Sequence, residues 1–333
     1  MDADETSRLT AAIETAARAA GHADARVSGL RRLGGGASKE SWGFVLESGG
    51  RRLESVLRCE PVLSRFAAEG SIPIATEAAL LRAARGQAVP VPLVHFELPP
   101  ESGFPGYVME CVHGESVGPR ILKDEKLAGA RAGLARQCGH ILAGLHRMAT
   151  SSLPPLERLG PAELLVRYRQ RYLATGQARP IFDLAFDWIE QRLPDEAEPT
   201  LVHGDFRNGN LMVGADGVRA VFDWEMAHIG HPAEDLGWLC VTSWRFQRPE
   251  LRVGGFGAAE DLLAAYREAG GRAVRLEELH HWDTFGTLRW GVMCAEVGVR
   301  FMDGVRTVEG AMIARRASET EYDLIRLIGG GHD

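Results

Sequence analysis

Cysteine is scarce in this chain of 333 residues: five occur, and no two of them form a Cys-X-X-Cys pair. An odd number of scattered cysteines argues against a disulfide framework, and the missing pair argues against a zinc site. The chain also lacks a basic, apolar N-terminal segment and any apolar run of about 20 residues. We therefore expect a cytoplasmic protein without a signal peptide or a membrane-spanning segment.

An excess of positive charge is also missing. The 45 Asp and Glu residues outnumber the 38 Lys and Arg residues, so the formal net charge is −7. A basic patch or stripe is what marks nucleic-acid binding, so we expect no nucleic-acid partner. Hydrophobic residues at 45% and charged residues at 25% are ordinary for a globular protein. The length fits two lobes better than one small core.

The most informative stretch, residues 201–224, reads LVHGDFRNGNLMVGADGVRAVFDW. It predicts a strand that ends at Val202, a polar loop, a strand LMV, a turn GADG and a strand AVF that leads into Asp223. Such a hairpin brings the side chains of Asp205, Asn210 and Asp223 together at one end of its two strands. Grouped oxygen ligands of this kind suit Mg²⁺ with substrate phosphates, and a carboxylate that holds no metal can accept a proton from a hydroxyl.

The order His203-Gly204-Asp205, four residues, Asn210 and then Asp223 resembles the catalytic segment of the aminoglycoside phosphotransferase and choline kinase-like family. The resemblance implies an α+β, protein-kinase-like fold of two lobes. The N-lobe would be a five-stranded antiparallel sheet with one helix, and the C-lobe would be mainly helical. Catalytic roles fall to His203 and Asp205, with Asp205 as the base, and metal binding falls to Asn210 and Asp223.

The N-terminal part has the pattern of a β-meander. We predict a helix over residues 1–20, with residues 1–24 as an extra element, and strands over 27–33, 40–47 and 53–59. A glycine-rich turn after the first strand consists of Gly34, Gly35, Gly36, Ala37 and Ser38. Glycine lets the backbone approach phosphates closely, and the family has a loop here that covers the nucleotide phosphates. An ordinary hairpin turn is the alternative.

The third strand departs from the pattern of kinase-like folds, which usually place a Lys there to hold the nucleotide phosphates. The strand ends ESVLRC, so Arg58 occupies that place. Arg keeps the charge but presents a planar fork. A helix over 74–84 carries Glu77, which the resemblance pairs with Arg58. The alternatives are a surface Arg at a strand end and a solvated acid in the first turn of a helix.

The end of the N-lobe is predicted from VPVPLVHFEL and YVME, which suggest an entry loop with a fourth strand and then a fifth. The resemblance makes the segment from Glu110 to Val112 the hinge, where backbone groups would meet the nucleotide base. We place the lobe boundary here, with an N-terminal nucleotide-binding lobe at 1–113. A helical C-terminal lobe, with the catalytic loop and the acceptor site, would then cover 114–333.

The C-terminal part has the apolar periodicity of helices. We predict helices over 127–148, 161–172 and 181–193, another that opens at Pro232, and three more across 257–328. Asp235 should hydrogen-bond the backbone around the HGD loop, as an Asp in this place does in the family. Several bulky or charged residues in the tail are candidates for the acceptor pocket: His280, His281, Trp282, Arg289, Trp290 and Glu296.

These observations favour a small-molecule kinase that transfers the γ-phosphate of ATP, or GTP, with Mg²⁺ to a hydroxyl acceptor. Two sequence segments are similar to those of phosphotransferase domains fused to acyl-CoA dehydrogenases, namely HGDFRNGNLMV and AVFDWEMAHIGHPAEDLGWL. This similarity suggests a hydroxylated acyl compound as readily as an aminoglycoside, a sugar or a choline-like acceptor. The alternatives are a catalytically silent nucleotide-binding module, suggested by Arg58, and a metal-dependent hydrolase. The sequence leaves the oligomeric state open.

Overall fold

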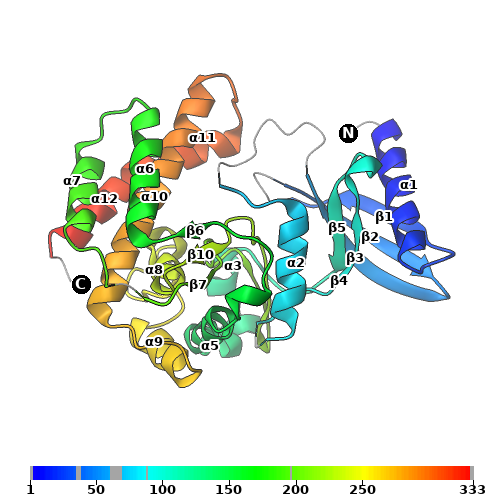
Figure 1. Cartoon of the computed structure of the whole chain (residues 1–333), viewed down its shortest axis with the longest axis horizontal. Coiled ribbons are helices and arrows are strands. Elements are labelled where there is room, and N and C mark those ends of the chain that lie inside the picture. Colours follow the sequence, from blue (N-terminus) through cyan, green and yellow to red (C-terminus); the bar gives the residue numbers. More distant parts are fainter. Residues whose placement is uncertain (1–2, 35–38, 61–69, 88, 196, 331–333) are drawn as a thin grey trace.

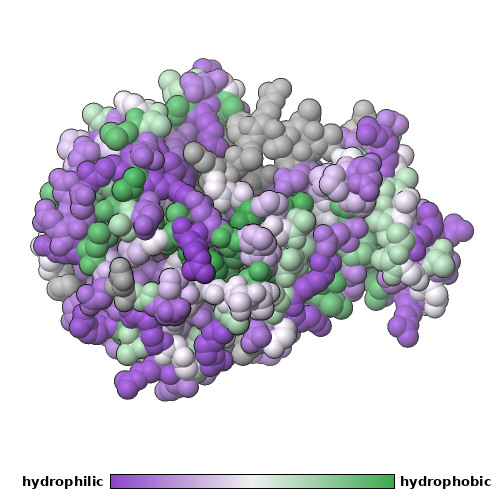
Figure 2. All heavy atoms as spheres, viewed as in Figure 1, coloured by the Kyte–Doolittle hydropathy of each residue, from purple (hydrophilic) through white to green (hydrophobic). Residues whose placement is uncertain are grey.

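A computed structural model describes residues 3–34, 39–60, 70–87, 89–195 and 197–330. A β-rich part at the N-terminal end and a larger helical part lie side by side (Figure 1). The α+β class and the two-part arrangement predicted from the sequence are therefore confirmed. On the face shown in Figure 2, hydrophilic residues cover most of the helical part. Among the described residues, no helix combines the length and the apolar character that crossing a membrane requires.

The N-terminal part is a five-stranded antiparallel sheet with the order β1-β2-β3-β5-β4. The predicted strands and helices are confirmed, with ends shifted by a few residues. Trp42, Phe44 and Leu46 alternate along β2 and pack with Leu9 and Ile13 of α1 in one core. The elements are α1 (Ala3–Ala19), β1 (Arg26–Arg32), β2 (Glu40–Ser48), β3 (Arg51–Cys59), α2 (Ile74–Arg85), β4 (Val94–Leu98) and β5 (Gly106–Glu110).

Helix α2 covers the other face of the sheet and lies between the sheet and the helical part (Figure 1). Val56 of β3 packs with α2 in the large core shared with the C-terminal part, whereas the next residue, Leu57, belongs to the core under α1. Because side chains alternate along a strand, β3 presents residues to both cores. Arg58, which follows Leu57, therefore faces α2 and the C-terminal part, where it meets Glu77 and Asp223.

The C-terminal part is built on helices. They are α3 (Gly118–Lys123), α4 (Ala128–Arg131), α5 (Leu134–His146), α6 (Pro161–Ala174), α7 (Pro180–Glu190), α8 (Ala233–Cys240), α9 (Ala259–Glu268), α10 (Leu276–Met302), α11 (Val308–Ala314) and α12 (Arg316–Ile328). Short strands form two small sheets: β6 (Arg158–Leu159), β10 (His228–Gly230) and β7 (Thr200–Val202) pair in that order, and β8 (Leu211–Gly214) pairs with β9 (Gly217–Val221).

Two helix predictions were wrong in detail. The single helix expected over 127–148 is divided into α4 and α5, with Gly133 as the residue that precedes α5. Glycine weakens a helix interior, and the periodicity of the apolar residues does not register such a break. The tail after residue 257 contains four helices rather than three, α9 to α12. The chain turns at Gly304, which has a φ of 107°, and Thr307 then caps α11 by accepting a hydrogen bond from Gly310.

Candidate active site

The hairpin β8–β9 places the three predicted oxygen-bearing residues as the sequence indicated. Asp205 lies in the loop between β7 and β8, Asn210 directly precedes β8, and Asp223 follows β9 by two residues. The backbone of Asn210 joins the two ends, because its carbonyl accepts a hydrogen bond from Phe222 N–H at 2.9 Å. Asp223 has a φ of 65°, a conformation that costs energy in residues other than glycine and that clusters at functional sites.

The Asp205 carboxylate is oriented by donors on both oxygens. Its Oδ1 accepts from Nε1 of Trp238 at 2.8 Å and from Nε of Arg207 at 2.9 Å. Its Oδ2 accepts from Nδ2 of Asn210 at 2.5 Å. The side chain remains 13% exposed, so a small molecule can reach it. A carboxylate fixed in this way can present an oxygen to an incoming hydroxyl.

Asn210 and Asp223 supply the oxygen atoms that a magnesium ion prefers. The amide nitrogen of Asn210 donates to the carboxylate and the backbone carbonyl of Asp205, so its Oδ1 is the atom that can face a cation. Asp223 keeps a quarter of its side chain exposed. A carboxylate and an amide oxygen at the mouth of one hairpin fit Mg²⁺, which is held by few protein ligands together with substrate phosphates.

Arg58 and Glu77 form the predicted pair. Nε of Arg58 lies 2.9 Å from Glu77, and its Nη2 lies 2.5 Å from Oδ1 of Asp223. Burial disfavours the charge on Arg58, but the attraction of Glu77 and Asp223 outweighs it and raises the pKa of the guanidinium above its usual value. The guanidinium of Arg58 thus contacts Glu77 of α2 and Asp223 after β9 through two different nitrogens. The single ammonium of a lysine cannot reproduce this geometry.

Lys39 is a second cation that the sequence reasoning missed. Its Nζ lies 3.6 Å from Glu77 and 3.6 Å from Glu225, and it donates to the carbonyl of Ile72 at 3.3 Å. Lys39 is one of only three lysines in the chain, and it is buried. A charged residue that follows the glycine-rich turn in a chain so poor in lysine was a usable signal. Lys39 and Arg58 thus both approach the carboxylate of Glu77.

His203 supports the catalytic loop from inside the protein. Its ring is fully buried, its Nδ1 accepts from Asp205 N–H at 3.1 Å, and its Nε2 lies 3.1 Å from the carbonyl of Phe222. Burial lowers the pKa of His203, so the ring is neutral, with its proton on Nε2. We therefore treat His203 as a positioning residue for Asp205 rather than as a group that touches the reacting atoms.

Asp235, at the start of α8, holds the same loop, and this prediction is confirmed. Its carboxylate accepts from the backbone N–H groups of His203 at 2.8 Å and of Gly204 at 3.0 Å. His146 of α5 completes the set at 3.2 Å. Burial alone would raise the pKa of Asp235, but the hydrogen bond from His146 and the other contacts lower it. Asp235 is therefore a buried anion that is fully supplied with donors.

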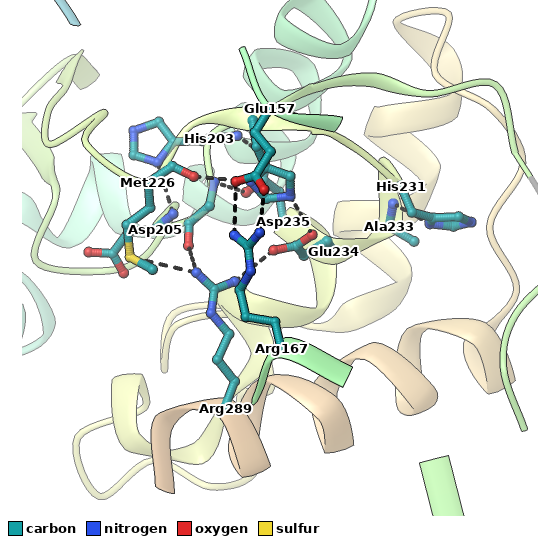
Figure 3. A network of polar contacts seen from close by, with 12 residues as sticks. Glu157, Arg167, His203, Asp205, Met226, His231, Ala233, Glu234, Asp235 and Arg289 are labelled. Carbon is teal, nitrogen blue, oxygen red and sulfur yellow. Dashed lines mark hydrogen bonds and ion pairs between the residues drawn. The ribbon is translucent and has the colours of Figure 1, made fainter. Parts of the chain in front are cut away.

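Arg289 of α10 reaches the loop from the opposite side (Figure 3). It donates to the carbonyl of Gly204 at 2.7 Å, to Glu234 at 2.6 Å and to the hydroxyl of Tyr168 at 2.8 Å. Gly204 has no room for a side chain, because a Cβ there would lie 2.4 Å from the carbonyl oxygen of Met226. The turn before Asp205 is thus fixed by α8, α10 and the backbone that follows β9.

Three tryptophans line up beside Asp205. Trp238 of α8 lies 5.4 Å from Trp244, and Trp244 lies 5.0 Å from Trp290 of α10, measured between ring centroids. Arg207 stacks over Trp244 at 4.6 Å. We call Trp238, Trp244 and Trp290 the tryptophan wall. Within the described part of the chain, the indole N–H groups of Trp244 and Trp290 are buried without a hydrogen-bond partner, which is unusual for buried donors.

The tail residues suggested for an acceptor pocket separate into groups. Arg289 holds the residue before Asp205 and Trp290 packs against Trp244, whereas Glu296 pairs with Arg171 of α6. His280 and His281 line a separate pocket of about 720 Å³ between α7, α10 and α12, and Trp282 packs beside His281. Helix α10 is 27 residues long, so residues close in sequence serve different regions.

The predicted nucleotide contacts are only partly visible. Gly34 is the first residue of the glycine-rich turn, and the other four, Gly35, Gly36, Ala37 and Ser38, lie outside the described residues. The Glu110 carboxylate accepts from Leu93 N–H at 2.9 Å, and its backbone N–H donates to Leu93. For Val112, the described part of the chain shows no backbone-to-backbone hydrogen bond. Val112 therefore keeps backbone groups that a nucleotide base could use.

Similar proteins of known sequence include members of the acyl-CoA dehydrogenase family. The rat family member 11 (Rattus norvegicus) is 32% identical over 205 residues, which are 54% of this chain and 25% of that protein. Mouse family member 10 (Mus musculus) is 30% identical over 183 residues, or 51% of this chain and 17% of that protein. The chain thus matches a quarter or less of the length of these relatives. The expected similarity to the branch found with acyl-CoA dehydrogenases is confirmed.

Solved structures share the fold over nearly the whole chain. A putative aminoglycoside phosphotransferase from Ralstonia eutropha superimposes with a TM-score of 0.74 at 22% identity, covering 96% of this chain and 98% of that one. A choline/ethanolamine kinase family protein from Mesorhizobium loti gives 0.65 at 19% identity, with coverages of 97% and 98%. The profile of the phosphotransferase enzyme family matches residues 29–272. Because this match covers well over half of the chain, the protein belongs to the phosphotransferase enzyme family.

Proposed function

We propose that this phosphotransferase is a magnesium-dependent small-molecule kinase that transfers the γ-phosphate of ATP to a hydroxyl group. The proposal rests on one observation: Asp205, Asn210 and Asp223 lie together at one end of the hairpin β8–β9, and Arg58 binds Asp223 at 2.5 Å. Residues 1–113 would form the nucleotide-binding lobe and residues 114–333 the lobe with the catalytic loop and the acceptor site. A structurally similar aminoglycoside phosphotransferase was crystallised with AMP-PNP and hygromycin B, which supports a nucleotide and an acceptor at this site.

The nucleotide would lie between the two lobes. Backbone groups at Glu110 and Val112 would contact the base, and the turn from Gly34 to Ser38 would cover the phosphates. Arg58, aligned by Glu77, would bind phosphate oxygens, and Lys39 would support the same charge. A further structural relative was solved with GDP and kanamycin, so GTP is the alternative donor to test beside ATP.

Transfer needs few chemical groups from the protein. Asp205 would accept the proton of the acceptor hydroxyl as that oxygen bonds to the γ-phosphorus, while the bond to the leaving diphosphate oxygen breaks. Asn210 and Asp223 would hold Mg²⁺, which neutralises charge on the phosphate oxygens. Arg58 would stabilise the charge that develops on the leaving group. His203 and Asp235 would keep Asp205 in place throughout, so that catalysis rests on positioning and charge.

We propose a hydroxylated acyl compound as the first acceptor class to test, ahead of a polycation. Arginines border the tryptophan wall: Arg207 stacks on Trp244, and Arg289 stacks on Trp238 at 4.5 Å. Arg289 is buried and paired with Glu234, whereas Arg207 keeps 26% of its side chain exposed, so an amine-rich antibiotic would meet a like charge at Arg207. The similarity to domains joined to acyl-CoA dehydrogenases points in the same direction, towards a hydroxylated acyl compound.

A turnover screen tests the proposed function. ATP and GTP would each be offered with Mg²⁺ and a panel of hydroxyacyl compounds, sugars, choline and aminoglycosides, and both nucleoside diphosphate and phosphorylated acceptor would be measured. Acceptor-dependent transfer supports the kinase. Release of phosphate without an acceptor would favour the hydrolase. Nucleotide binding without turnover on any acceptor would favour the silent module.

The Arg58–Glu77 pair should behave as one unit in nucleotide binding. Arg58→Ala should lower nucleotide affinity and turnover together, Arg58→Lys should recover part of the loss, and Glu77→Gln should give a smaller defect. The double variant should lose less than the sum of the single losses, since the two residues act through one contact. Calorimetric affinities of the variants provide the measurement. Additive losses, or no effect of Arg58→Ala, would contradict the assignment, and Arg82→Ala, in an exposed ion pair on the same helix as Glu77, is the control.

Lys39 should matter for the phosphates as well as for the fold. Lys39→Met keeps the buried stem but removes the charge beside Glu77 and Glu225, so we expect nucleotide affinity to fall about tenfold. Competitive displacement of a fluorescent nucleotide measures the change, with Lys126→Met, an exposed lysine, as the matched control. A variant that loses only thermal stability, with its nucleotide affinity intact, would show that Lys39 is purely structural.

A further inference from the structure

A cysteine, a histidine and a glutamate meet on the surface beside the predicted hinge. Their ligand atoms, Sγ of Cys111, a ring nitrogen of His113 and a carboxylate oxygen of Glu54, all lie within 4.8 Å of one another. Nε2 of His113 is 2.8 Å from the Glu54 carboxylate. Within the described residues, this is the one group of three such side chains with that spacing.

The sheet explains why the three side chains share a face. β3 and β5 pair with Ser55 opposite Glu110, so the next position along sets Glu54 opposite Cys111. The backbone confirms the register, because Cys111 N–H donates to the carbonyl of Glu54 at 3.0 Å. His113 lies two residues beyond Cys111, and side chains two apart in an extended chain point the same way. The spacing of cysteines in the sequence could not reveal this group, because one ligand comes from another strand.

Cys111 differs from the other cysteines in its access to solvent. Cys59, Cys138, Cys240 and Cys294 are buried, whereas Cys111 is only partly so. Glu54 and His113 are largely exposed, at 62% and 71% of their side chains. Burial and the nearby Glu54 raise the pKa of the Cys111 thiol. A bound metal ion would supply the positive charge that favours the thiolate.

We propose that Glu54, Cys111 and His113 form a binding site for a divalent transition metal such as Zn²⁺. Thiolate sulfur, imidazole nitrogen and carboxylate oxygen are the three ligand types of zinc, and water would complete a tetrahedron. The bond lengths of such a site bring ligand atoms to roughly 3.5 Å from one another, which small rotations of these exposed side chains can achieve. Mg²⁺ does not compete for this set, because it requires oxygen ligands.

The position of the site gives it a consequence for motion between the lobes. Glu54 belongs to the sheet, whereas the carbonyl of His113 accepts a hydrogen bond from Arg219 of the catalytic hairpin at 2.8 Å. Two residues further, Glu115 pairs with Val213 of β8. A metal ion bound by Glu54, Cys111 and His113 would therefore tie the sheet to a linker that is already anchored to the other lobe. Such a tie restrains hinge motion, and we expect it to slow turnover.

Cobalt binding by the complete protein tests the site directly. Co²⁺ would be titrated in excess Mg²⁺ and followed by its thiolate charge-transfer band, which carboxylates alone do not produce. We expect one Co²⁺ per chain, displaced by Zn²⁺. Affinity should fall at least about tenfold in Cys111→Ser and His113→Ala, less in Glu54→Gln, and not at all in His140→Ala, an exposed histidine of α5. No thiolate band in the wild type, or equal affinity in Cys111→Ser, overturns the site.

A second measurement separates binding from its effect. With the best acceptor from the turnover screen, Zn²⁺ in excess Mg²⁺ should slow the wild type severalfold but leave His113→Ala at its zinc-free rate, and the rates of the two proteins without zinc should agree. Equal inhibition of both proteins would overturn the hinge effect. The cobalt titration needs no turnover, so its failure and a failure of the proposed kinase activity can be told apart.

Discussion

Asp205→Asn should reduce turnover at least about 100-fold and leave nucleotide affinity near that of the wild type. The carboxylate receives hydrogen bonds from Trp238, Arg207 and Asn210. An amide in its place keeps the shape but cannot take a proton from the acceptor. Steady-state rates, together with calorimetric affinity for Mg·nucleotide, separate loss of the base from loss of the site.

The result depends on the loop staying in place, so a matched control is needed. Asp187→Asn makes the same chemical change at an exposed carboxylate of α7, and we expect its rate to be unchanged. Thermal unfolding of Asp205→Asn should remain cooperative, because His203 and Asp235 still hold the backbone. An Asp205→Asn protein that retains full activity on the true acceptor would show that another group accepts the proton.

Asp223→Asn should act through the metal instead. The substitution removes a negative charge but suits the local backbone, because Asn tolerates the φ of 65° found at this position. We expect Mg²⁺-dependent nucleotide affinity to fall at least about tenfold and turnover to fall further, since the metal ion would lose its only carboxylate among the two proposed ligands. The measurement is a nucleotide titration at several Mg²⁺ concentrations.

The same titration contains its own check. In Asp223→Asn, excess Mg²⁺ should recover part of the affinity, whereas Asp205→Asn should show no such recovery. Asp216→Asn changes an exposed carboxylate on the turn of the same hairpin and should match the wild type. Unchanged affinity of Asp223→Asn for Mg·nucleotide would remove this residue from the proposed metal site.

The catalytic hairpin was predictable because its information is local. Asp205, Asn210 and Asp223 lie within one short stretch, and a turn of four residues is enough to define how the two strands meet. The five strands of the sheet followed from alternation and turn residues in the same way. The pair Arg58 and Glu77 required knowledge of the fold, because the two residues lie on a strand and a helix that only the packing brings together.

The remainder of the site depends on contacts between distant segments. Lys39 reaches Glu77 and Glu225, and Trp238 reaches Asp205 across 33 residues. Sequence periodicity does not predict such long-range contacts. Taken alone, each of these residues is typical of a surface charge or of an aromatic residue in the core. The division between α4 and α5 was missed for a related reason: apolar spacing continues through a break that the backbone makes.

Arg289 has a consequence for how this protein could change over generations. One side chain from α10 holds the loop before Asp205 and also stacks on the tryptophan wall. A chimera that imports α10 from a relative with another acceptor would therefore import the support of its catalytic loop as well. Under the proposed function, α10 would contribute both to acceptor binding, through Trp290, and to the support of Asp205, through Arg289. Single substitutions at Trp244 and Trp290 would therefore change the acceptor site with less effect on the catalytic loop than replacement of the whole helix.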